Sequence, residues 1–297
     1  MQAASGAPSL HPRVAMSLHP TVSNATLDEP ESVLPQDTGT YRKISGRFVS
    51  RGRVAFGALY WLAWIIGSRR SVAGSGVARE LDLLGVGSLR LVASASVLVG
   101  LISTFQLAYQ LKQWGAESMS ALAIGWFATR ELGPLVVALL VISRSASAIA
   151  GELAAMQTGA EIDALRAMGL DPVKYLVAPK LAALVIALPA LTIISDGLIT
   201  IGGWIGSTFF LGLNSRAYLE QIHSSLGMTD IAIGVGKAVL FSLVIGIVAA
   251  DEGLNVERHV GAIGQAASRA VVYCLLGVLG TDTFINAVFY FIPGLVF

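Results

Sequence analysis

Charge is scarce in this sequence. Of its 297 residues only 13% are charged, while 54% are hydrophobic. Ordinary soluble domains carry about 25% charged residues, so this chain has too few charges to cover a water-exposed surface of its size. The 20 basic residues nearly balance the 19 acidic ones, and without a basic excess a nucleic-acid-binding protein is disfavoured. The composition indicates a membrane protein.

Cysteine and the motifs of membrane-embedded enzymes are also missing. Cys274 is the one cysteine, which excludes an internal disulfide and a multi-cysteine metal site. The sequence has neither the His-Glu-x-x-His motif of zinc hydrolases nor the Gly-x-Ser-x-Gly motif of serine hydrolases. His223 and His259 fall in different predicted loops, where a solvated histidine is more common than a catalytic base. We therefore expect no catalytic residues and no metal site.

A phosphate-binding loop for ATP is absent from the sequence as well. Such a loop needs the pattern Gly-x-x-x-x-Gly-Lys-Ser/Thr, so that backbone N–H groups and the lysine surround the phosphates. The one Gly-Lys pair, Gly236–Lys237, is followed by Ala238, has Ile231 in place of the first glycine and lies in an apolar segment. If ATP powers this protein, another polypeptide must bind the nucleotide.

The amino-terminal part divides into two regions. Residues 1–40 hold five of the ten prolines and show no apolar period, which predicts a disordered tail that is neither a secretory signal nor an organellar transit peptide. Residues 41–88 form a basic segment. Within it, Val54–Gly67 carries Trp61 and Trp64 but no charge, and it is shorter than the roughly 20 residues that a spanning helix needs. We expect a helix lying in the membrane interface, with a short buried helix as the alternative.

Residues 89–297 are expected to form an all-α membrane domain. Five segments with few or no charges are long enough to cross a bilayer: Leu91–Leu111, Met119–Ile149, Leu181–Ser215, Ile231–Ala250 and Ala270–Phe297. The third segment is ambiguous, because Pro189 and the glycines at Gly202, Gly203 and Gly206 could kink one helix or turn a hairpin.

The distribution of basic residues favours five spans. With five, sixteen of the 20 lysines and arginines lie on the side of the amino terminus, and only Lys112 and Arg216 lie on the other. A hairpin in the third segment would weaken this bias. Because basic loops stay in the cytoplasm, the amino terminus and the loops at 144–180 and 251–269 are expected to be cytoplasmic, and the carboxyl terminus periplasmic.

The loop Glu152–Lys180 has strong helix punctuation. Thr158 followed by Glu161 matches a capping box, Gly169 suits a helix end, and Asp171–Pro172 can end one helix and begin the next. Three apolar residues recur at intervals of three and share a predicted face: Ile162, Leu165 and Met168. We expect a short cytoplasmic helix, at about 158–172, that docks either on its own membrane bundle or on a soluble partner.

Several of these residues together resemble a known family. Arg130–Pro134 (RELGP), Glu161–Pro172 (EIDALRAMGLDP) and Leu279–Asp282 (LGTD) occur in the order seen in the MlaE/YrbE permeases of ABC transporters that work with MCE-domain proteins. The resemblance covers roughly residues 85–292. The ordered combination is specific, whereas any one of the motifs alone is weak.

The resemblance implies a fold and a set of partners. Permeases of this family are similar in having an interfacial helix, five spans and a cytoplasmic coupling helix between the second and third spans. They form homodimers in the inner membrane, dock a separate ABC ATPase that binds ATP and Mg, and hold a periplasmic ring of MCE-domain proteins. The implied function is ATP-driven movement of phospholipid or a similar lipid between the inner membrane and the periplasm or outer membrane. The implied ATPase-coupling residues are Glu161, Asp163, Leu165, Arg166, Met168, Asp171 and Pro172. On composition alone, a scaffold or channel without ATP coupling stays possible.

Charged residues inside the spans are the remaining candidates for a site. Arg130, Glu131, Lys237 and Asp282 lie within apolar segments, where a charge costs about 2.5–3.5 kcal/mol on insertion scales and usually pairs. The four could neutralise one another. They either surround a lipid path or form ion pairs that fix the helix register, and we favour the ion pairs. Asp196 is a further acid with no evident base in the sequence.

Two patterns of uncharged residues concern helix contacts. Gly202 and Gly206 form a Gly-x-x-x-Gly pattern that permits close helix approach, at a dimer seam or, as we slightly favour, at a crossing within the chain. Four residues at helical spacing on the first span are possible lining of a lipid cavity: Leu98, Leu101, Phe105 and Tyr109. The same stripe could instead face lipid or a neighbouring helix.

Overall fold

The computed structural model describes residues 76–115, 119–259 and 261–291, together with 52, 54, 56–60 and 63. All regular secondary structure in this part is helical, as the composition predicts. The expected disordered tail at 1–40 lies outside the described residues. The expected interfacial helix is described only in part, with helical backbone at 54, 56–60 and 63.

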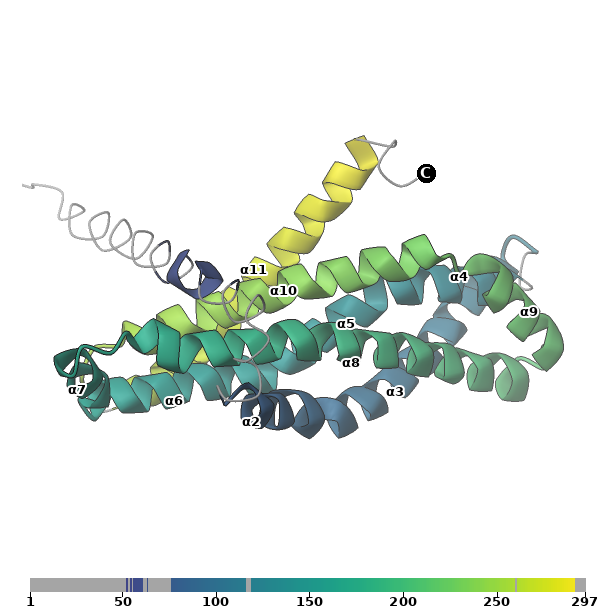
Figure 1. Ribbon diagram of the computed structural model, residues 1–297. Helices are drawn as coiled ribbons and strands as arrows, with labels where there is room; N and C mark the ends of the chain where they lie inside the picture. Colours follow the sequence, from purple (N-terminus) through teal and green to yellow (C-terminus); the bar gives the residue numbers. More distant parts are fainter. Residues whose placement is uncertain are drawn as a thin grey trace, which may run out of the picture. The chain divides into compact units, whose positions relative to one another are not determined.

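Five helices in the described part are long and apolar enough to cross a membrane. They run over Val77–Lys112, Ala121–Thr158, Val173–Phe210, Met228–Leu254 and Ala262–Phe291. This confirms the five-span prediction (Figure 1). The first span begins at Val77, well before the apolar run that predicted it, because the helix continues through charged residues at its start. The third span contains α8, which continues without a break through Pro189, so this segment is one span and not a hairpin.

Most spans are built from α-helical pieces joined by short π-helical segments. The first comprises α2 (Val77–Leu81), η1 (Asp82–Val86) and α3 (Gly87–Lys112). The second comprises α4 (Ser120–Phe127), η3 (Ala128–Leu132), α5 (Gly133–Val141), η4 (Ile142–Ala146) and α6 (Ser147–Thr158). The third comprises η5 (Val173–Val177), α8 (Ala178–Ile205) and η6 (Gly206–Phe210). Such π-helical turns are rare and frequently mark functional sites.

The remaining elements close the two ends of the bundle. Between the second and third spans lies the short helix α7 (Glu161–Ala167). At the opposite end, α9 (Ser215–Ser225) packs against α4 and leads to the fourth span, α10 (Met228–Leu254) (Figure 1). The fifth span, α11 (Ala262–Phe291), packs against α10 and α6.

Helices α3 and α8 cross at a contact that only glycine permits. A Cβ atom on Gly100 would lie 2.1 Å from the carbonyl oxygen of Ile199, and one on Gly202 would lie 2.3 Å from that of Val97. A side chain at either position would therefore push the two backbones apart. Gly202 serves a crossing within the chain, in agreement with the favoured prediction.

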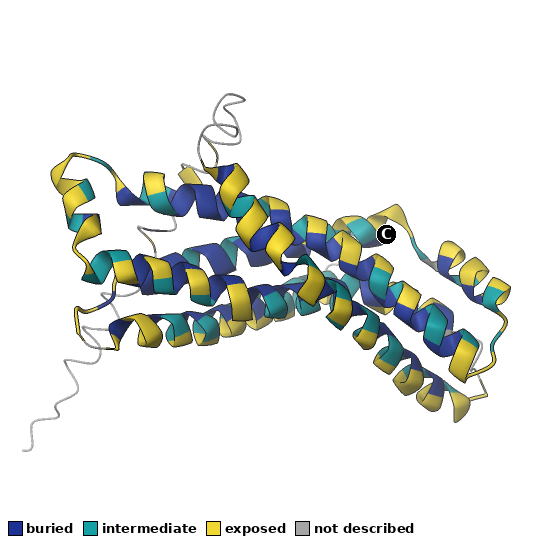
Figure 2. Cartoon of the chain, turned by 90° about the horizontal axis from the view of Figure 1, so that it is seen from below, coloured by how far each residue is buried: buried dark blue, intermediate teal, exposed yellow. Residues whose placement is uncertain are grey.

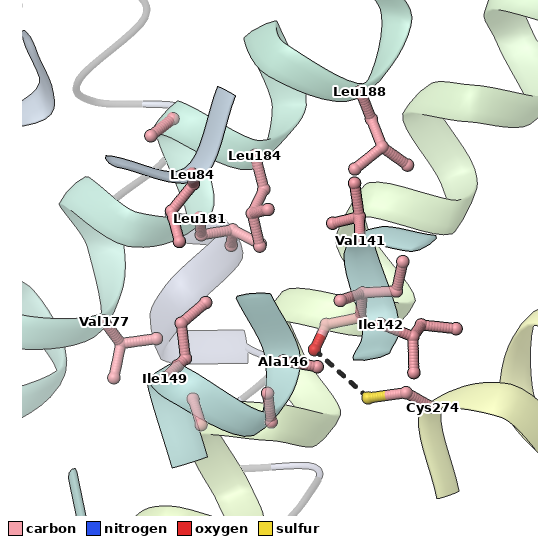
Figure 3. Packing of buried hydrophobic residues seen from close by; sticks show 14 of the residues in the cluster. Leu84, Val141, Ile142, Ala146, Ile149, Val177, Leu181, Leu184, Leu188 and Cys274 are labelled. Carbon is pink, nitrogen blue, oxygen red and sulfur yellow. Dashed lines mark hydrogen bonds between the residues drawn. The ribbon is translucent and has the colours of Figure 1, made fainter. Parts of the chain in front are cut away.

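The apolar core lies on the α7 side of the bundle. Leu188 of α8 points toward Val141 of the second span, whereas Leu181 and Leu184 lie beside Leu84 of the first (Figure 3). The single cysteine, Cys274, is buried in the same cluster, and its thiol donates to the carbonyl oxygen of Ile245 at 3.6 Å. Buried residues line the inner sides of the long helices, whereas exposed residues follow their outer sides (Figure 2). Many of the exposed ones are large and apolar, among them Ile102 and Phe284, as expected of helices that face lipid.

Candidate functional site: a buried charge network and the α7 end

The second span widens into a π-helical turn where it carries its first two charges. Arg130 and Glu131 lie in η3, directly before Gly133 and Pro134. Proline has no N–H, and in a regular helix its ring clashes with the carbonyl group four residues earlier. Here the N–H of Gly133 donates to the carbonyl oxygen of Ala128, five residues back. The wider turn accommodates the proline and presents Arg130 and Glu131 toward α10.

Lys237 of α10 is the centre of the network. Its side chain is only 2% exposed, and its Nζ atom lies 2.8 Å from Glu131 Oε1, 2.9 Å from Asp282 Oδ1 and 2.8 Å from Asn286 Oδ1. An ammonium group has three donors, so these three acceptors satisfy it completely. The amide of Asn286 donates in turn to Glu131 and Asp282, at 3.3 and 3.4 Å. The network therefore joins the second, fourth and fifth spans.

Arg130 forms the second ion pair of this region. Its Nε donates to Asp230 Oδ1, and its guanidinium lies 4.5 Å from the ring centroid of Trp126. The other carboxylate oxygen of Asp230 accepts the backbone N–H of Gly227 at 2.9 Å, at the start of α10. The predicted four charges therefore do not close on themselves. Two bases face three acids, because Arg130 takes its partner from outside the predicted set.

The network borders a cavity of about 200 Å³. Its lining comprises Trp126, Phe127, Arg130, Glu131, Ile233, Lys237, Asn286 and Phe289. The polar groups come from the network and the aromatic rings from its neighbours. Helix α10 approaches the second span closely here, since a Cβ on Gly234 would lie 2.3 Å from the carbonyl oxygen of Thr129. An aromatic cavity with a fixed charged wall is suited to an amphiphile.

Sequence reasoning missed two members of the network. Asp230 lies one residue before the predicted start of its span at Ile231, outside the apolar run. Asn286 is neutral, so no charge marks it within its span. Both have a signal at helical spacing: Asp230 precedes Lys237 by two turns, and Asn286 follows Asp282 by four residues.

Asp196 stands apart from this network. It is nearly buried in α8, and its Oδ1 has no hydrogen-bond partner among the described residues. The carboxylate lies against Gly133, where a Cβ atom would be only 1.6 Å from Oδ1. No base in the described part pairs with Asp196. Its proximity explains why position 133 has no side chain.

At the α7 end the predicted capping box is wrong, whereas the helix end at Gly169 and the start of the third span at Asp171–Pro172 are confirmed. The hydroxyl of Thr158 donates to the carbonyl oxygens of Ala154 and Ala155, so it does not cap α7 and the capping-box prediction is wrong. The turn after α6 is so short that Thr158 still belongs to the last turn of that helix. The N-terminal cap position of α7 is Ala160, with φ +62°.

The exit from α7 has the predicted geometry. Gly169 adopts a positive φ of 75°, its N–H bonds to the carbonyl of Arg166, and the N–H of Leu170 bonds to that of Leu165. This pair of bonds is the Schellman motif, which ends helices at glycine. Asp171 Oδ1 then accepts the N–H of Val173 at 3.0 Å, so Asp171 and Pro172 begin the third span. Helix α7 and the third span are thus joined by a defined turn.

The predicted apolar face of α7 is divided. Ile162 is fully buried, Leu165 is half-buried and Met168 is 65% exposed. Ile162 therefore attaches the helix to its own bundle, while Met168 stays available for a partner. Glu161, Arg166 and Asp171 are exposed as well.

Asp163 ties α7 to the turn between α10 and α11. Its carboxylate accepts from Arg258 and, at 3.1 Å, from Arg166, and Arg258 also donates to the carbonyl oxygen of Gln157 at 3.1 Å. The hydrogen bond from Arg258 lowers the pKa of Asp163 below its ordinary value. The two loops predicted to be cytoplasmic are therefore in contact at one end of the bundle.

The possible cavity-lining residues of the first span separate into two pairs. Phe105 and Tyr109 border a hollow of about 360 Å³ near the end of α3, together with Ala108, Lys112, Phe210, Leu211 and Leu213. The rings of Phe105 and Phe210 meet edge to face, with centroids 5.4 Å apart. Leu98 and Leu101 lie outside this lining, nearer the middle of the span.

Comparison with known proteins places this geometry in a family. Residues 77–288 match the family model described as Permease MlaE, a range that contains all five spans up to the last turn of α11, the charge network and α7. The chain belongs to the MlaE permease family. It is 33% identical to a probable ABC transporter permease protein of Rickettsia typhi over 66% of this chain and 76% of that protein. It is 31% identical to the intermembrane phospholipid transport system permease protein MlaE of Haemophilus influenzae, over 71% of this chain and 82% of that protein.

A more distant relative extends the similarity. A probable ABC transporter permease protein of Pyropia yezoensis is 28% identical over 82% of this chain and 91% of that protein. Membership of the MlaE permease family agrees with a multi-pass membrane protein that acts as the transport subunit of an ABC system. The roles of individual residues remain predictions.

Proposed function

We propose that this chain is the permease subunit of an ATP-driven transporter that moves phospholipid, or a similar lipid, between the inner membrane and the periplasm or outer membrane. The Haemophilus relative, named as an intermembrane phospholipid transport permease, supports the substrate class. The observation that carries the proposal is α7, a short helix that is followed by the exposed Met168 and attached to the second span, the third span and the turn between the fourth and fifth. Such a helix can pass the movement of a docked partner into the bundle.

The attachments of α7 explain how that movement would spread. The helix follows the second span after a short turn, and the turn at Gly169–Asp171 joins it to the third. Asp163 and Arg258 link it to the turn between the fourth and fifth spans. Farther into the membrane, Lys237 joins the second, fourth and fifth spans again. A displacement of α7 would therefore act on the second span and on the turn between the fourth and fifth. These are the three spans that the charge network joins.

The partners and the orientation follow from the same proposal. A separate ABC ATPase would bind ATP and Mg and dock on Glu161, Leu165 and Met168, which places α7 and the amino terminus in the cytoplasm. A second copy of the chain would complete the lipid path, and an MCE-domain ring would sit at the periplasmic end near α9. The contact between the loops at 144–180 and 251–269 supports placing both on one side of the membrane.

Two methionines at opposite ends of the bundle give a matched test of ATPase docking. Met168 in the turn after α7 is 65% exposed, and Met228 at the start of α10 is 85% exposed. Met168→Asp should abolish co-purification of the ATPase and lipid transfer in reconstituted vesicles, and Leu165→Asp should act in the same way. Met228→Asp should leave ATPase association intact. If the ATPase stays bound to folded Met168→Asp and Leu165→Asp proteins, α7 is not the docking helix, and a scaffold or channel without ATP coupling becomes the better explanation.

A further inference from the structure

Arg144 is an exposed arginine of the second span whose guanidinium contacts the first span. Its Nη1 donates to Ser88 Oγ at 3.1 Å. A Cβ atom on Gly87 would be 2.6 Å from its Nη2 and 3.2 Å from its Cζ. A side chain at position 87 would therefore force the guanidinium to move. Arg144 is exposed, so the group lies on the outer surface of the bundle.

The hydrogen-bonding capacity of Arg144 is largely unused within the described residues. A guanidinium has five N–H donors, and Ser88 is the one acceptor that this part of the chain gives it. None of the carboxylates in the described ranges pairs with Arg144. The partly described stretch 43–75 contains no Asp or Glu, so it offers no counter-ion either. An anionic partner would stabilise a charge of this kind in a membrane span.

Arg90 is a second exposed base on the same face. It follows Gly87 by three residues on α3, and residues at this spacing are neighbours on a helix surface, with Cβ atoms about 5–6 Å apart. Like Arg144, it has no carboxylate partner among the residues that the structure describes. The guanidinium of Arg144 lies against Gly87, and the spacing places Arg90 on the same face of α3. Two arginines on one face match the charge of a phosphate, and the planar guanidinium matches its geometry.

The surface next to the arginines is apolar along one lane of the first span. Leu83, Leu91 and Leu98 are exposed and recur on the face that carries Gly87. From Gly87 to Leu98 the helix rises about 16 Å, close to half of the roughly 30 Å hydrocarbon core of a bilayer. A lipid with its phosphate at Gly87 would lay its tails along this lane and end near the bilayer midplane.

From these observations we infer that Arg144, which contacts Gly87, and Arg90, on the same face of α3, bind the phosphate of an anionic phospholipid in the leaflet on the α7 side. The site is distinct from the Lys237 network. The lane continues on α3 toward the hollow at Phe105 and Tyr109, so the bound lipid would lie where a lipid path begins. This last step rests on the proposed transport function, whereas the binding site itself does not.

Lipid binding to the full chain tests the site. The purified protein would be titrated with dioleoyl-phosphatidylglycerol and dioleoyl-phosphatidylcholine and followed by native mass spectrometry. Arg144→Gln and Arg90→Gln should each weaken phosphatidylglycerol binding about tenfold, and the double variant should bind both lipids equally. Gly87→Ala should weaken binding in the same direction, because the new Cβ displaces the guanidinium of Arg144. Arg216→Gln, which removes an exposed arginine at the α9 end, is the matched control and should change nothing.

Four outcomes would overturn the inference. The first is a folded double variant that still prefers phosphatidylglycerol. The second is equal competition by glycerol 3-phosphate, which would indicate a site for soluble phosphates. The third is loss of the dimer with lipid binding intact, which would make this face an interface between copies. The fourth is unchanged phosphatidylglycerol binding in both Arg90→Gln and Gly87→Ala. These two variants carry the test if Arg144→Gln does not fold. Normal phosphatidylglycerol binding without lipid transfer would instead contradict the transport proposal and leave the site in place.

Discussion

Two buried lysines join spans of this bundle, and their surroundings differ. Lys180, at the α7 end, lies 3.0 Å from Glu80 and 2.8 Å from Glu152, and so joins the first, second and third spans. Lys237 joins the second, fourth and fifth through Glu131 and Asp282. Both lysines are almost fully buried. Each lysine has two carboxylate partners, so the two clusters are equivalent in the number of their ion pairs.

The difference lies in what surrounds the carboxylates. The side chain of Glu152 is 56% exposed, so it can turn to water if its lysine is removed. Glu131 and Asp282 are 29% and 15% exposed, and Lys237 has Asn286 as its third partner beside an aromatic cavity. Removing one partner of a buried pair is costly because the other charge is left uncompensated, whereas an exposed ion pair contributes little. One carboxylate of the Lys180 cluster is therefore open to water, whereas both carboxylates of the Lys237 network are mostly buried.

The largest effect is expected at Lys237. Lys237→Met leaves Glu131 and Asp282 facing each other without a base, and should lower the free energy of unfolding by about 3–5 kcal/mol. The protein would be recovered in low yield, with a reduced melting temperature in detergent. A melting temperature equal to that of the wild type would show that the Lys237 network does not hold the spans together.

A neutralised network separates a structural role from a functional one. Combining Lys237→Met with Glu131→Gln and Asp282→Asn removes every unpaired charge from this cluster, and should restore most of the lost stability. If lipid transfer returns as well, the charges serve to fix the helix register, which is the role that the sequence analysis favours. If the protein is stable but inactive, the charges act on the lipid or on the coupling of helix movement.

A smaller effect is expected at Lys180. Lys180→Met strands one largely buried carboxylate, Glu80, while Glu152 can be hydrated, so the loss should be about 1–2 kcal/mol. Glu152→Gln is the matched control and should cost less than about 1 kcal/mol. The measurement is again the melting temperature of the purified protein. A loss as large as that of Lys237→Met would contradict the proposed difference between the two clusters.

The sequence predicted the parts of this fold that depend on local composition. Five apolar runs located the five spans, and Gly169 with Asp171–Pro172 located the end of α7, since each of these signals acts within a few residues. The capping box at Thr158 failed because the start of α7 is shifted by two residues, to an N-cap at Ala160, which leaves Thr158 in the preceding helix. Local patterns do not determine that shift.

Contacts between spans were harder to predict from the sequence. Arg130 and Asp230 are 100 residues apart, and Arg144 and Ser88 are 56 apart, so no spacing rule connects them. The sequence indicated that the charges inside the spans must pair, because an isolated charge is too costly there. It did not indicate which partners they choose, since that depends on how the helices cross.

The smallest expected effect concerns the exposed pair between Asp163 and Arg258, outside both lysine clusters. The lowered pKa of Asp163 means that the ionised carboxylate is favoured in the folded protein. Its contribution is therefore present above the unfolded-state pKa, and is lost as the pH falls through the lower folded-state value. Asp163→Asn should speed amide hydrogen exchange in α7 in pulses at pH 6, because the helix loses its tie to the turn between α10 and α11. At pH 3, after correction for the intrinsic rate, the difference from the wild type should shrink. It should also shrink in high salt, as expected of a solvent-exposed pair. Equal exchange at pH 6 would mean that Ile162 alone attaches α7 to the bundle.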